Sequence, residues 1–458
     1  MDSMHALFRR AADVAADHRA AVGSRPVPAP ATLPDLLAGL DRTLQDDPRG
    51  AEQVLDELVT GFGPGVTGSV GPRFFGYVIG GATPSATAAD MVAAGWDQCA
   101  FNATLSPAAA AAEQVAGRWV TDVLGLPARA SVGFVTGAQG ANTAGLAAAR
   151  HHVLSRAGWD VERDGLLGAP AVRVVASEER HATIDRSLRL LGLGTSSVRA
   201  VAAGPNGAMD TTALADVLAR GSGPVIVCLQ AGNVNTGATD DLRAATAVAR
   251  AHDAWVHVDG AFGLWAAASP ATAGQLDGVD LADSWSCDAH KWLNVPYDVG
   301  LAITAHPEVA AATLSYTAAY LTGHSGTTPL LGDVVPESSR RARGFAVWAA
   351  MRELGRSGIA DLVDRCCAHA RRFADGLAAG GAEVVNDVVL NQVLVSFGDD
   401  ARTDRVVEAV QADGTCWLGG TTWHGRRLMR VSVSNATTTQ DDVDQSVAAI
   451  LRAAAAVA

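Results

Sequence analysis

The sequence has 458 residues, of which 48% are hydrophobic and 18% are charged, and its formal net charge at pH 7 is −13. This length is about three times that of one minimal domain, so we expect a large α/β domain with a smaller companion. Nucleic-acid binding requires Lys and Arg side chains clustered on one face, and here the arginines are scattered along an acidic chain, so no nucleic-acid partner is expected.

The amino-terminal residues favour a cytoplasmic protein. Charged residues interrupt the alanine-rich segment 1–20, which therefore lacks the apolar core of a signal peptide. No uncharged apolar run of about 18 residues is present, so no membrane span is expected. The six cysteines have no framework spacing and are interpreted as buried thiols. The adjacent pairs His151–His152 and Cys366–Cys367 lack zinc-site spacing, so no metal is expected.

Residues 1–68 combine short helical patterns with several prolines, which is typical of an arm laid over another surface. A helix is predicted over residues 106–126, with Ser106 as its N-cap and Pro107 at the first helical position. Short β-branched runs then alternate with alanine-rich helical stretches, which predicts a mostly parallel sheet covered by helices on both faces. These runs are residues 132–136, 172–176, 198–202, 225–229, 255–258 and 300–304.

Beyond residue 340 the pattern changes and predicts a small α+β domain. Two helices are expected over residues 341–354 and 359–379, and a last helix starts near Thr439, where acidic residues suit a helix N-terminus. Strands are expected at residues 384–388, 392–397 and 428–433. The organisation predicted is therefore an arm (1–68), a large α/β domain (69–340) and a C-terminal domain (341–458).

Ligands of such sheets bind beyond the carboxyl ends of the strands, and residues able to do chemistry follow several of the predicted strands. Lysine is scarce in the sequence, and Lys291 lies in an apolar and aromatic segment where a lysine amine removed from water can form an imine. By itself it also fits a lysine that extends from a strand end to solvent. Asp259 follows an apolar strand and can pair with a protonated pyridine nitrogen, or it simply caps the strand.

Two further features lie near predicted strand ends. The glycine-rich turn 137–140 joins a strand to a helix, so its free N–H groups suit an anion, although it is also typical of a merely tight turn. His181 follows another strand, where an imidazole can stack flat on a cofactor ring, although most single histidines are structural. Together with Lys291 and Asp259, these features favour a bound cofactor.

The segment SCDAHKWLNVPYDVG, with HVDGAFG upstream, resembles the group II pyridoxal-phosphate (PLP) dependent amino-acid decarboxylases. The segments GPRFFG, ESSRRARGFAVWAAMRELGRSG and RLMRVSVSNATTTQDDVD resemble other parts of that family in the same order. The resemblance implies the aspartate-aminotransferase-like fold (type I PLP transferases), PLP as cofactor, an amino acid as substrate, and a homodimer with active sites at the interface. The arm 1–68 would then wrap around the partner.

The resemblance also implies a role for each matching residue at the cofactor. Lys291 would carry PLP as a Schiff base, Asp259 would pair with its pyridine nitrogen, and His181 would stack on its ring. The remaining implied contacts are the backbone N–H groups of Ala138 and Gln139 with His290 at the phosphate, and Ala261 beneath the ring. Asn233 stands where relatives usually have a threonine, so its role is open.

For the substrate, the resemblance implies that Arg430 meets the carboxylate. Phe75, Phe101 and Trp417 are candidates for an apolar lining, although each is equally consistent with an ordinary core aromatic residue. No arginine cluster suited to an acidic side chain is evident, which favours an aromatic or apolar amino acid. The products would be the amine and CO₂.

One departure from the family pattern leaves the outcome of the reaction open. Aromatic amino-acid decarboxylases protonate the reacting carbon with a tyrosine on a mobile loop, and the matching residues 321–335 contain no tyrosine. We expect His324, or Tyr316 or Tyr320 of the partner subunit, to take that role. The alternatives are an aldehyde synthase, an aminotransferase or a carbon–carbon lyase. A nucleotide-binding oxidoreductase would need a GxGxxG turn that is absent, and Lys291 disfavours a non-catalytic scaffold.

Overall fold

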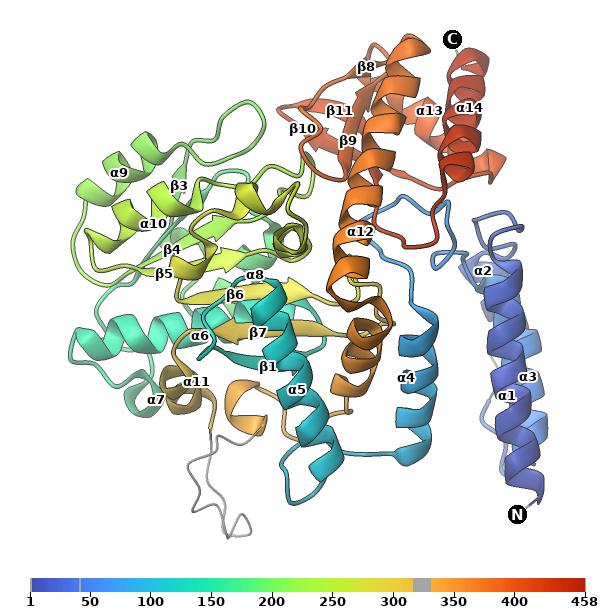
Figure 1. Ribbon diagram of the computed structural model, residues 1–458, viewed down its shortest axis with the longest axis horizontal. Helices are drawn as coiled ribbons and strands as arrows, with labels where there is room; N and C mark the ends of the chain where they lie inside the picture. Colours follow the sequence, from blue (N-terminus) through green and yellow to red (C-terminus); the bar gives the residue numbers. More distant parts are fainter. Residues whose placement is uncertain (1, 41–42, 316–330, 458) are drawn as a thin grey trace. The chain divides into compact units, whose positions relative to one another are not determined.

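The structure is a computed structural model that describes residues 2–40, 43–315 and 331–457. These residues form two compact units (Figure 1). The larger unit comprises residues 82–371 and 386–392, and the other comprises residues 1–81, 372–385 and 393–458. The three-segment organisation expected from the sequence stays a prediction.

A seven-stranded sheet forms the centre of the larger unit, in the order β1-β7-β6-β5-β4-β2-β3. Strand β7 runs antiparallel to both of its neighbours and the other pairs are parallel, so the predicted mostly parallel sheet is confirmed. Every residue of β4 to β7 is buried, as expected for strands covered on both faces. The strands are β1 (Ser131–Val135), β2 (Arg173–Ser177), β3 (Val198–Val201), β4 (Val225–Gln230), β5 (Trp255–Asp259), β6 (Ser284–Asp288) and β7 (Gly300–Thr304).

Strand β6 was not predicted, because two of its five residues are serines and it has no β-branched run. Both serine side chains are fully buried and hydrogen-bonded within the sheet. Ser286 donates from Oγ to Asp259, and Ser284 Oγ accepts from the indole of Trp255. These partners remove the cost of burying the hydroxyl groups, and only the folded sheet supplies them.

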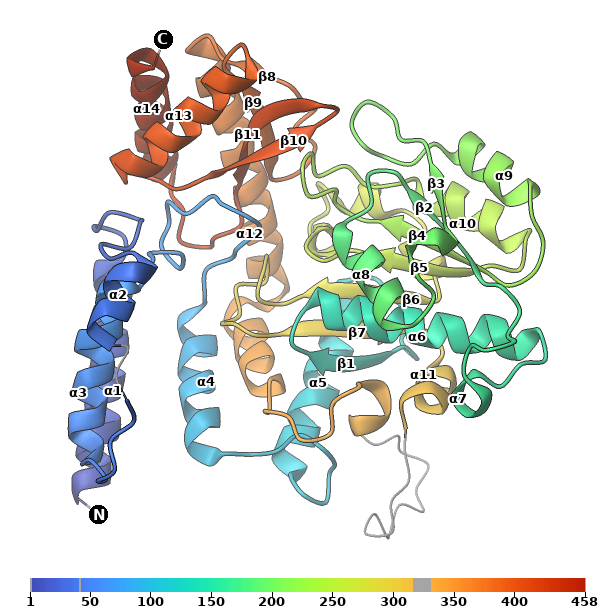
Figure 2. The ribbon, with the colours of Figure 1, turned by 180° about the vertical axis from the view of Figure 1, so that it is seen from behind.

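Helices cover both faces of this sheet. Helix α6 lies across β5, β6 and β7 with α8 beside it (Figure 2), while α9 and α10 cover the region of β2 to β5 (Figure 1). The N-cap predicted for the helix near residue 106 is confirmed, since Ser106 Oγ accepts from the N–H of Ala109. The helices are α4 (Pro84–Trp96), α5 (Pro107–Val123), α6 (Ala138–Arg156), α7 (Val161–Asp164), α8 (Ala182–Leu190), α9 (Thr211–Ala219), α10 (Leu242–Arg250), α11 (Pro307–Leu314) and α12 (Gly344–Ala379).

Helix α12 is interrupted at Gly355, which has φ +61°, so the two helices predicted over this region are confirmed together with the break between them. Its last residues belong to the other unit. Short 3-10 helices occur in both units at Gly63–Gly65, Thr195–Ser197, Gly263–Ala268, Ala273–Leu276, Val279–Leu281 and Leu331–Val334.

The other unit contains the amino-terminal helices and a small sheet with strand order β10-β11-β9-β8. Helix α14 begins as predicted at Thr439, which forms a reciprocal capping box with Asp442. Helix α13 and strand β10 were not predicted, and β8 has only two residues where a longer strand was expected. The elements are α1 (Asp2–Ala21), α2 (Leu33–Leu40), α3 (Ala51–Phe62), β8 (Glu383–Val384), β9 (Gln392–Ser396), α13 (Asp400–Asp413), β10 (Gly419–Trp423), β11 (Arg426–Ser432) and α14 (Gln440–Ala456).

Candidate active site

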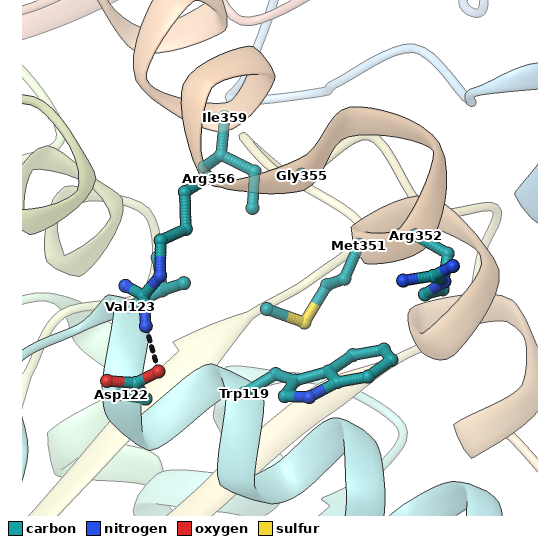
Figure 3. A pocket seen from close by; sticks show the side chains of 8 residues that line it. All are labelled: Trp119, Asp122, Val123, Met351, Arg352, Gly355, Arg356 and Ile359. Carbon is teal, nitrogen blue, oxygen red and sulfur yellow. Dashed lines mark hydrogen bonds and ion pairs between the residues drawn. The ribbon is translucent and has the colours of Figure 1, made fainter.

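Two hollows of the larger unit have the same volume, about 250 Å³, and the chemistry of their walls distinguishes them. The first lies between α5 and α12, where the side chains of Trp119 and Met351 face it (Figure 3). Among its charged residues, Arg356 is paired with Asp122 across the hollow. This hollow offers neither a lysine nor a buried carboxylate, so it lacks the groups expected of the cofactor site.

The second hollow, called here the lysine pocket, collects residues from the carboxyl ends of the strands and contains Lys291. Most of the residues assigned to the cofactor from the sequence line it, while Asn233 lies between two lining residues without being one itself. The lining consists of Gly137, Ala138, Gln139, His181, Thr183, Gln230, Gly232, Val234, Asp259, Ala261, Phe262, Asp288, His290 and Lys291.

Asp259 is the last residue of β5 and is 6% exposed. Its Oδ1 accepts from the N–H of Ala261 at 3.3 Å and from Ser286 Oγ at 3.1 Å. Its Oδ2 accepts from Asn142 Nδ2 at 3.2 Å. Donors on both oxygens hold the carboxylate in one orientation at the edge of the pocket.

Lys291 meets a buried carboxylate three residues earlier in the chain. Its Nζ lies 3.0 Å from Oδ2 of Asp288, which is 2% exposed. The other oxygen of Asp288 accepts from the N–H of Ala138 at 2.6 Å and lies 3.5 Å from Nε2 of His290. Asp288 therefore connects the lysine to the glycine-rich turn and to His290. The sequence did not indicate a role for Asp288, because an aspartate at the end of a strand gives no specific signal.

His290 is buried, and this burial lowers its pKa, so the ring is neutral near pH 7. Its Nδ1 accepts from the N–H of Val299 at 3.1 Å, which leaves the proton of the neutral ring on Nε2, facing Asp288. Gly137 makes room for the ring, since a Cβ on this glycine would lie 3.2 Å from Cε1 of His290.

The glycine-rich turn leads directly from β1 into α6, whose first residue is Ala138. The N–H of Ala138, expected at the phosphate, already donates to Asp288, so the positive end of this 19-residue helix and the N–H of Gln139 are what suit a phosphate here. The side chain of Gln139 points elsewhere, because its Nε2 donates to Ser187 Oγ at 2.9 Å. Gln139 can therefore serve an anion through its backbone.

His181 is the N-cap of α8, and its Nδ1 lies 2.8 Å from Oγ1 of Thr183. Gln230, at the end of β4, is 6% exposed, and its Nε2 has no hydrogen-bond partner among the residues that the structure describes. A buried amide donor without a partner is costly, and this one belongs to a residue that lines the pocket. Sequence reasoning missed Gln230, because a glutamine that ends an apolar strand predicts nothing by itself.

These groups fit PLP. Asp259 offers a carboxylate to the ring nitrogen, and Lys291 offers an amine to the aldehyde. The start of α6 offers a backbone N–H group to the phosphate. The unpartnered Nε2 of Gln230 supplies a further donor for an oxygen of the ligand. Within the described ranges no group of three or more His, Cys, Asp or Glu side chains could hold a metal ion, and none of the helices found there combines the length and apolar character of a membrane span.

The substrate residues expected from the sequence do not line the lysine pocket. Phe101, in the larger unit, lies against Gly332, where a Cβ would come within 3.2 Å of its ring. Phe75, Trp417 and Arg430 belong to the other unit. There Phe75 packs on Phe373 at 4.8 Å, Trp417 stacks on Phe74 at 4.9 Å, and burial lowers the pKa of Arg430 to about 10. Tyr316, Tyr320 and His324 lie outside the described residues, and all of these roles remain predictions.

Comparison with known proteins agrees with this chemistry. Residues 34–398 match the family described as the pyridoxal-dependent decarboxylase conserved domain. Tryptophan decarboxylase 1 of Oryza sativa subsp. japonica is 28% identical, with 95% of this chain and 90% of that protein covered. The 4-hydroxyphenylacetaldehyde synthase of Rhodiola rosea is also 28% identical, over 86% of this chain and 83% of that protein. A solved structure of Oryza sativa TDC with PLP and tryptamine is 25% identical, covers 100% of this chain and 98% of its own, and superimposes with a TM-score of 0.92.

Proposed function

This chain belongs to the pyridoxal-dependent decarboxylase family, and on that premise we propose that it converts an aromatic or apolar L-amino acid to the corresponding amine and CO₂. It is a PLP-dependent carboxy-lyase by family, and the substrate and the roles of single residues are our proposals. The observation that carries them is one pocket in which Lys291, the only lysine of the sequence, lies with Asp259 and the start of α6. A cytoplasmic location stays a prediction.

In the proposed mechanism, Lys291 would hold the cofactor covalently through Nζ. The bound cofactor supplies an electron-withdrawing ring that stabilises the negative charge left when the carboxylate departs. Asp259 would keep the ring nitrogen protonated through its negative charge. Donors within the protein on both of its oxygens would hold the carboxylate in place. His181 would cover the ring, and Gln230 would donate from its otherwise unpartnered Nε2.

Asp288 would hold the proton of Lys291. Its carboxylate lies 3.0 Å from Nζ and would stabilise the ammonium form of the lysine whenever this amine carries no cofactor. The same carboxylate accepts from the backbone of Ala138, so it stays in place while the lysine moves. His324, or Tyr316 or Tyr320 of the partner subunit, would deliver the proton to the substrate carbon. If the variant His324→Ala still formed amine at the normal rate, His324 would have no part in this step.

The substrate proposal is supported by the relatives. One is a tryptophan decarboxylase, and the solved structure contains tryptamine, an aromatic amine. A second candidate function, aldehyde synthesis, is favoured by the equal identity to an aldehyde synthase and by the tyrosine-free segment 321–335.

A visible spectrum of the purified holoenzyme, followed by product analysis with tryptophan, tyrosine and phenylalanine, tests the proposal. We expect a cofactor absorption band that borohydride fixes to the peptide containing Lys291, and that Lys291→Ala abolishes. Because the sequence has no other lysine, the labelled peptide is unambiguous and only the amino terminus competes. Amine with CO₂ supports the decarboxylase, aldehyde supports the second candidate, and a protein that stays colourless with added PLP contradicts both.

A further inference from the structure

A buried chain of hydrogen bonds leads from the core of the larger unit to the carboxylate of Asp259. The indole Nε1 of Trp255 donates to Ser284 Oγ at 2.9 Å, and the same oxygen lies 2.8 Å from Nδ1 of His257. Nε2 of His257 lies 2.8 Å from Oδ1 of Asn142, and Nδ2 of Asn142 donates to Asp259 at 3.2 Å. Trp255, Ser284, His257 and Asn142 are each at most 1% exposed, and none of them lines the lysine pocket.

The direction of every bond in this chain follows from its last member. The carboxylate of Asp259 can only accept, so the NH₂ group of Asn142 faces it and the carbonyl oxygen of Asn142 accepts from Nε2–H of His257. Nδ1 of the neutral imidazole then accepts the hydroxyl hydrogen of Ser284, whose oxygen accepts from the indole of Trp255. Burial lowers the pKa of His257 to about 4, which agrees with a neutral ring. The amide of Asn142 is thereby fixed with its NH₂ group toward Asp259.

The second hydrogen of that NH₂ group connects Asn142 to His181 through a hydroxyl group. Asn142 Nδ2 lies 3.1 Å from Oγ1 of Thr183, which in turn lies 2.8 Å from Nδ1 of His181. Because Thr183 accepts from the amide, its hydroxyl hydrogen is free to be donated to His181. One amide group therefore contacts the carboxylate of Asp259 directly and the imidazole of His181 through a single hydroxyl group.

The surrounding structure is built to hold the imidazole of His257 in this place. Gly145 of α6 faces the ring, and a Cβ there would lie 2.8 Å from its Cε1 and 2.9 Å from its Nδ1. A backbone approach this close fixes the ring between helix and sheet, since a displaced ring would meet the helix. His257 has hydrogen-bond partners on both ring nitrogens, so it has no second stable orientation of equal quality.

We propose that Asn142, held in one orientation by His257, is a positioning residue that aligns Asp259 and His181 on the cofactor ring. The inference rests on the cofactor site proposed above and assigns a role to residues outside the lysine pocket. Were the amide to turn over, its carbonyl oxygen would face the carboxylate of Asp259 and repel it. His257 prevents this, because its Nε2–H group requires an acceptor at that position.

The test uses holoenzyme reconstituted with PLP that carries ¹⁵N in the pyridine ring. In Asn142→Leu and His257→Phe we expect the ¹⁵N signal to move toward that of an unprotonated ring, and the PLP dissociation constant to rise about tenfold or more, as when outer-shell partners are removed elsewhere. His257→Gln should restore both values, because its amide N–H can take the place of Nε2–H. The matched control is Thr246→Val. This change deletes a buried hydroxyl group in another part of the same unit, and that hydroxyl has no hydrogen-bond partner among the described residues.

Wild-type values of both quantities in folded Asn142→Leu and His257→Phe proteins would overturn the proposal. If either large substitution prevents folding, the variant Ser284→Ala tests the proposal in its place. It removes only the hydroxyl group that donates to the imidazole of His257. We expect Ser284→Ala to shift the ¹⁵N signal in the same direction, and an unchanged signal contradicts the proposal. Failure of the proposed function has a different signature, because the wild-type protein would then either retain no cofactor signal or retain it without forming amine and CO₂.

Discussion

At the scale of single residues, the site depends on polar groups that are buried and fully partnered. Asp288 and Asp259 each accept from a backbone N–H and from side chains of other elements, so both carboxylates are fixed before any ligand binds. Gln230 is the contrast, because its buried Nε2 has no hydrogen-bond partner within the described part of the chain. Such a group is tolerated where a ligand supplies the missing acceptor.

The buried ring of His257 makes the stability of the protein depend on pH. Its folded pKa of about 4 lies below its ordinary 6.5, so between these values the unfolded chain binds a proton that the folded chain does not. The free energy of unfolding therefore falls as the pH is lowered from about 6.5 to about 4, by on the order of 2 kcal/mol. Urea unfolding at about pH 7 and about pH 5 should show that the wild type loses more stability, or gains less, than His257→Gln on acidification.

Asp240 also makes the stability depend on pH, and the comparison of the two proteins removes its contribution. Burial raises its pKa to about 6, so its contribution has the opposite sign and stability falls as the pH rises from 3.8 to about 6. Asp240 is present in both proteins, and its effect cancels in the difference between them. An identical pH dependence of wild type and His257→Gln would show that folding does not shift the pKa of His257.

At the scale of elements, the break in α12 shows how one backbone position ends a helix. Gly355 has φ +61°, and a Cβ there would meet nothing within 4 Å, so only backbone strain opposes a side chain. Its ψ is −179°, a conformation essentially restricted to glycine, so we expect Gly355→Ala to lower the free energy of unfolding by about 1–3 kcal/mol. Gly95 in α4 is the matched control, since it has helical φ and equally open surroundings. Gly95→Ala should raise stability by up to about 1 kcal/mol, and equal effects of both changes would contradict this account.

At the scale of the whole molecule, the amino-terminal helices favour the homodimer expected from the family. Several apolar side chains on α1 to α3 are half exposed or more, including Phe8 at 57%, Leu37 at 50% and Leu58 at 54%. A row of exposed apolar residues on successive helices is typical of a surface that another chain covers. We propose that the arm binds the partner subunit.

Light scattering at micromolar concentration tests that proposal. The full chain should have the mass of a dimer, and the double variant Leu58→Asp with Phe62→Asp should shift it toward the monomer, because two charges would be buried at the interface. Leu167→Asp is the control, since this leucine is 93% exposed in the larger unit and should leave the mass unchanged. A monomeric wild-type protein would show that the arm has another role.

Local sequence patterns predicted the periodic part of the fold and the pocket residues that belong to a motif. Short β-branched runs predicted six of the seven strands of the large sheet, the cap at Ser106 predicted the start of α5, and the segments around Asp259 and Lys291 predicted the cofactor. Local patterns suffice there, because the hydrophobic period and the capping chemistry act within a few residues. Strand β6 could not be predicted from local patterns, because its serines become compatible with burial only through hydrogen-bond partners on β5. The tertiary structure alone decided that Gln230, Asp288 and Asn142 belong at or behind the site, because their meaning depends on which groups the folded chain places within hydrogen-bonding distance.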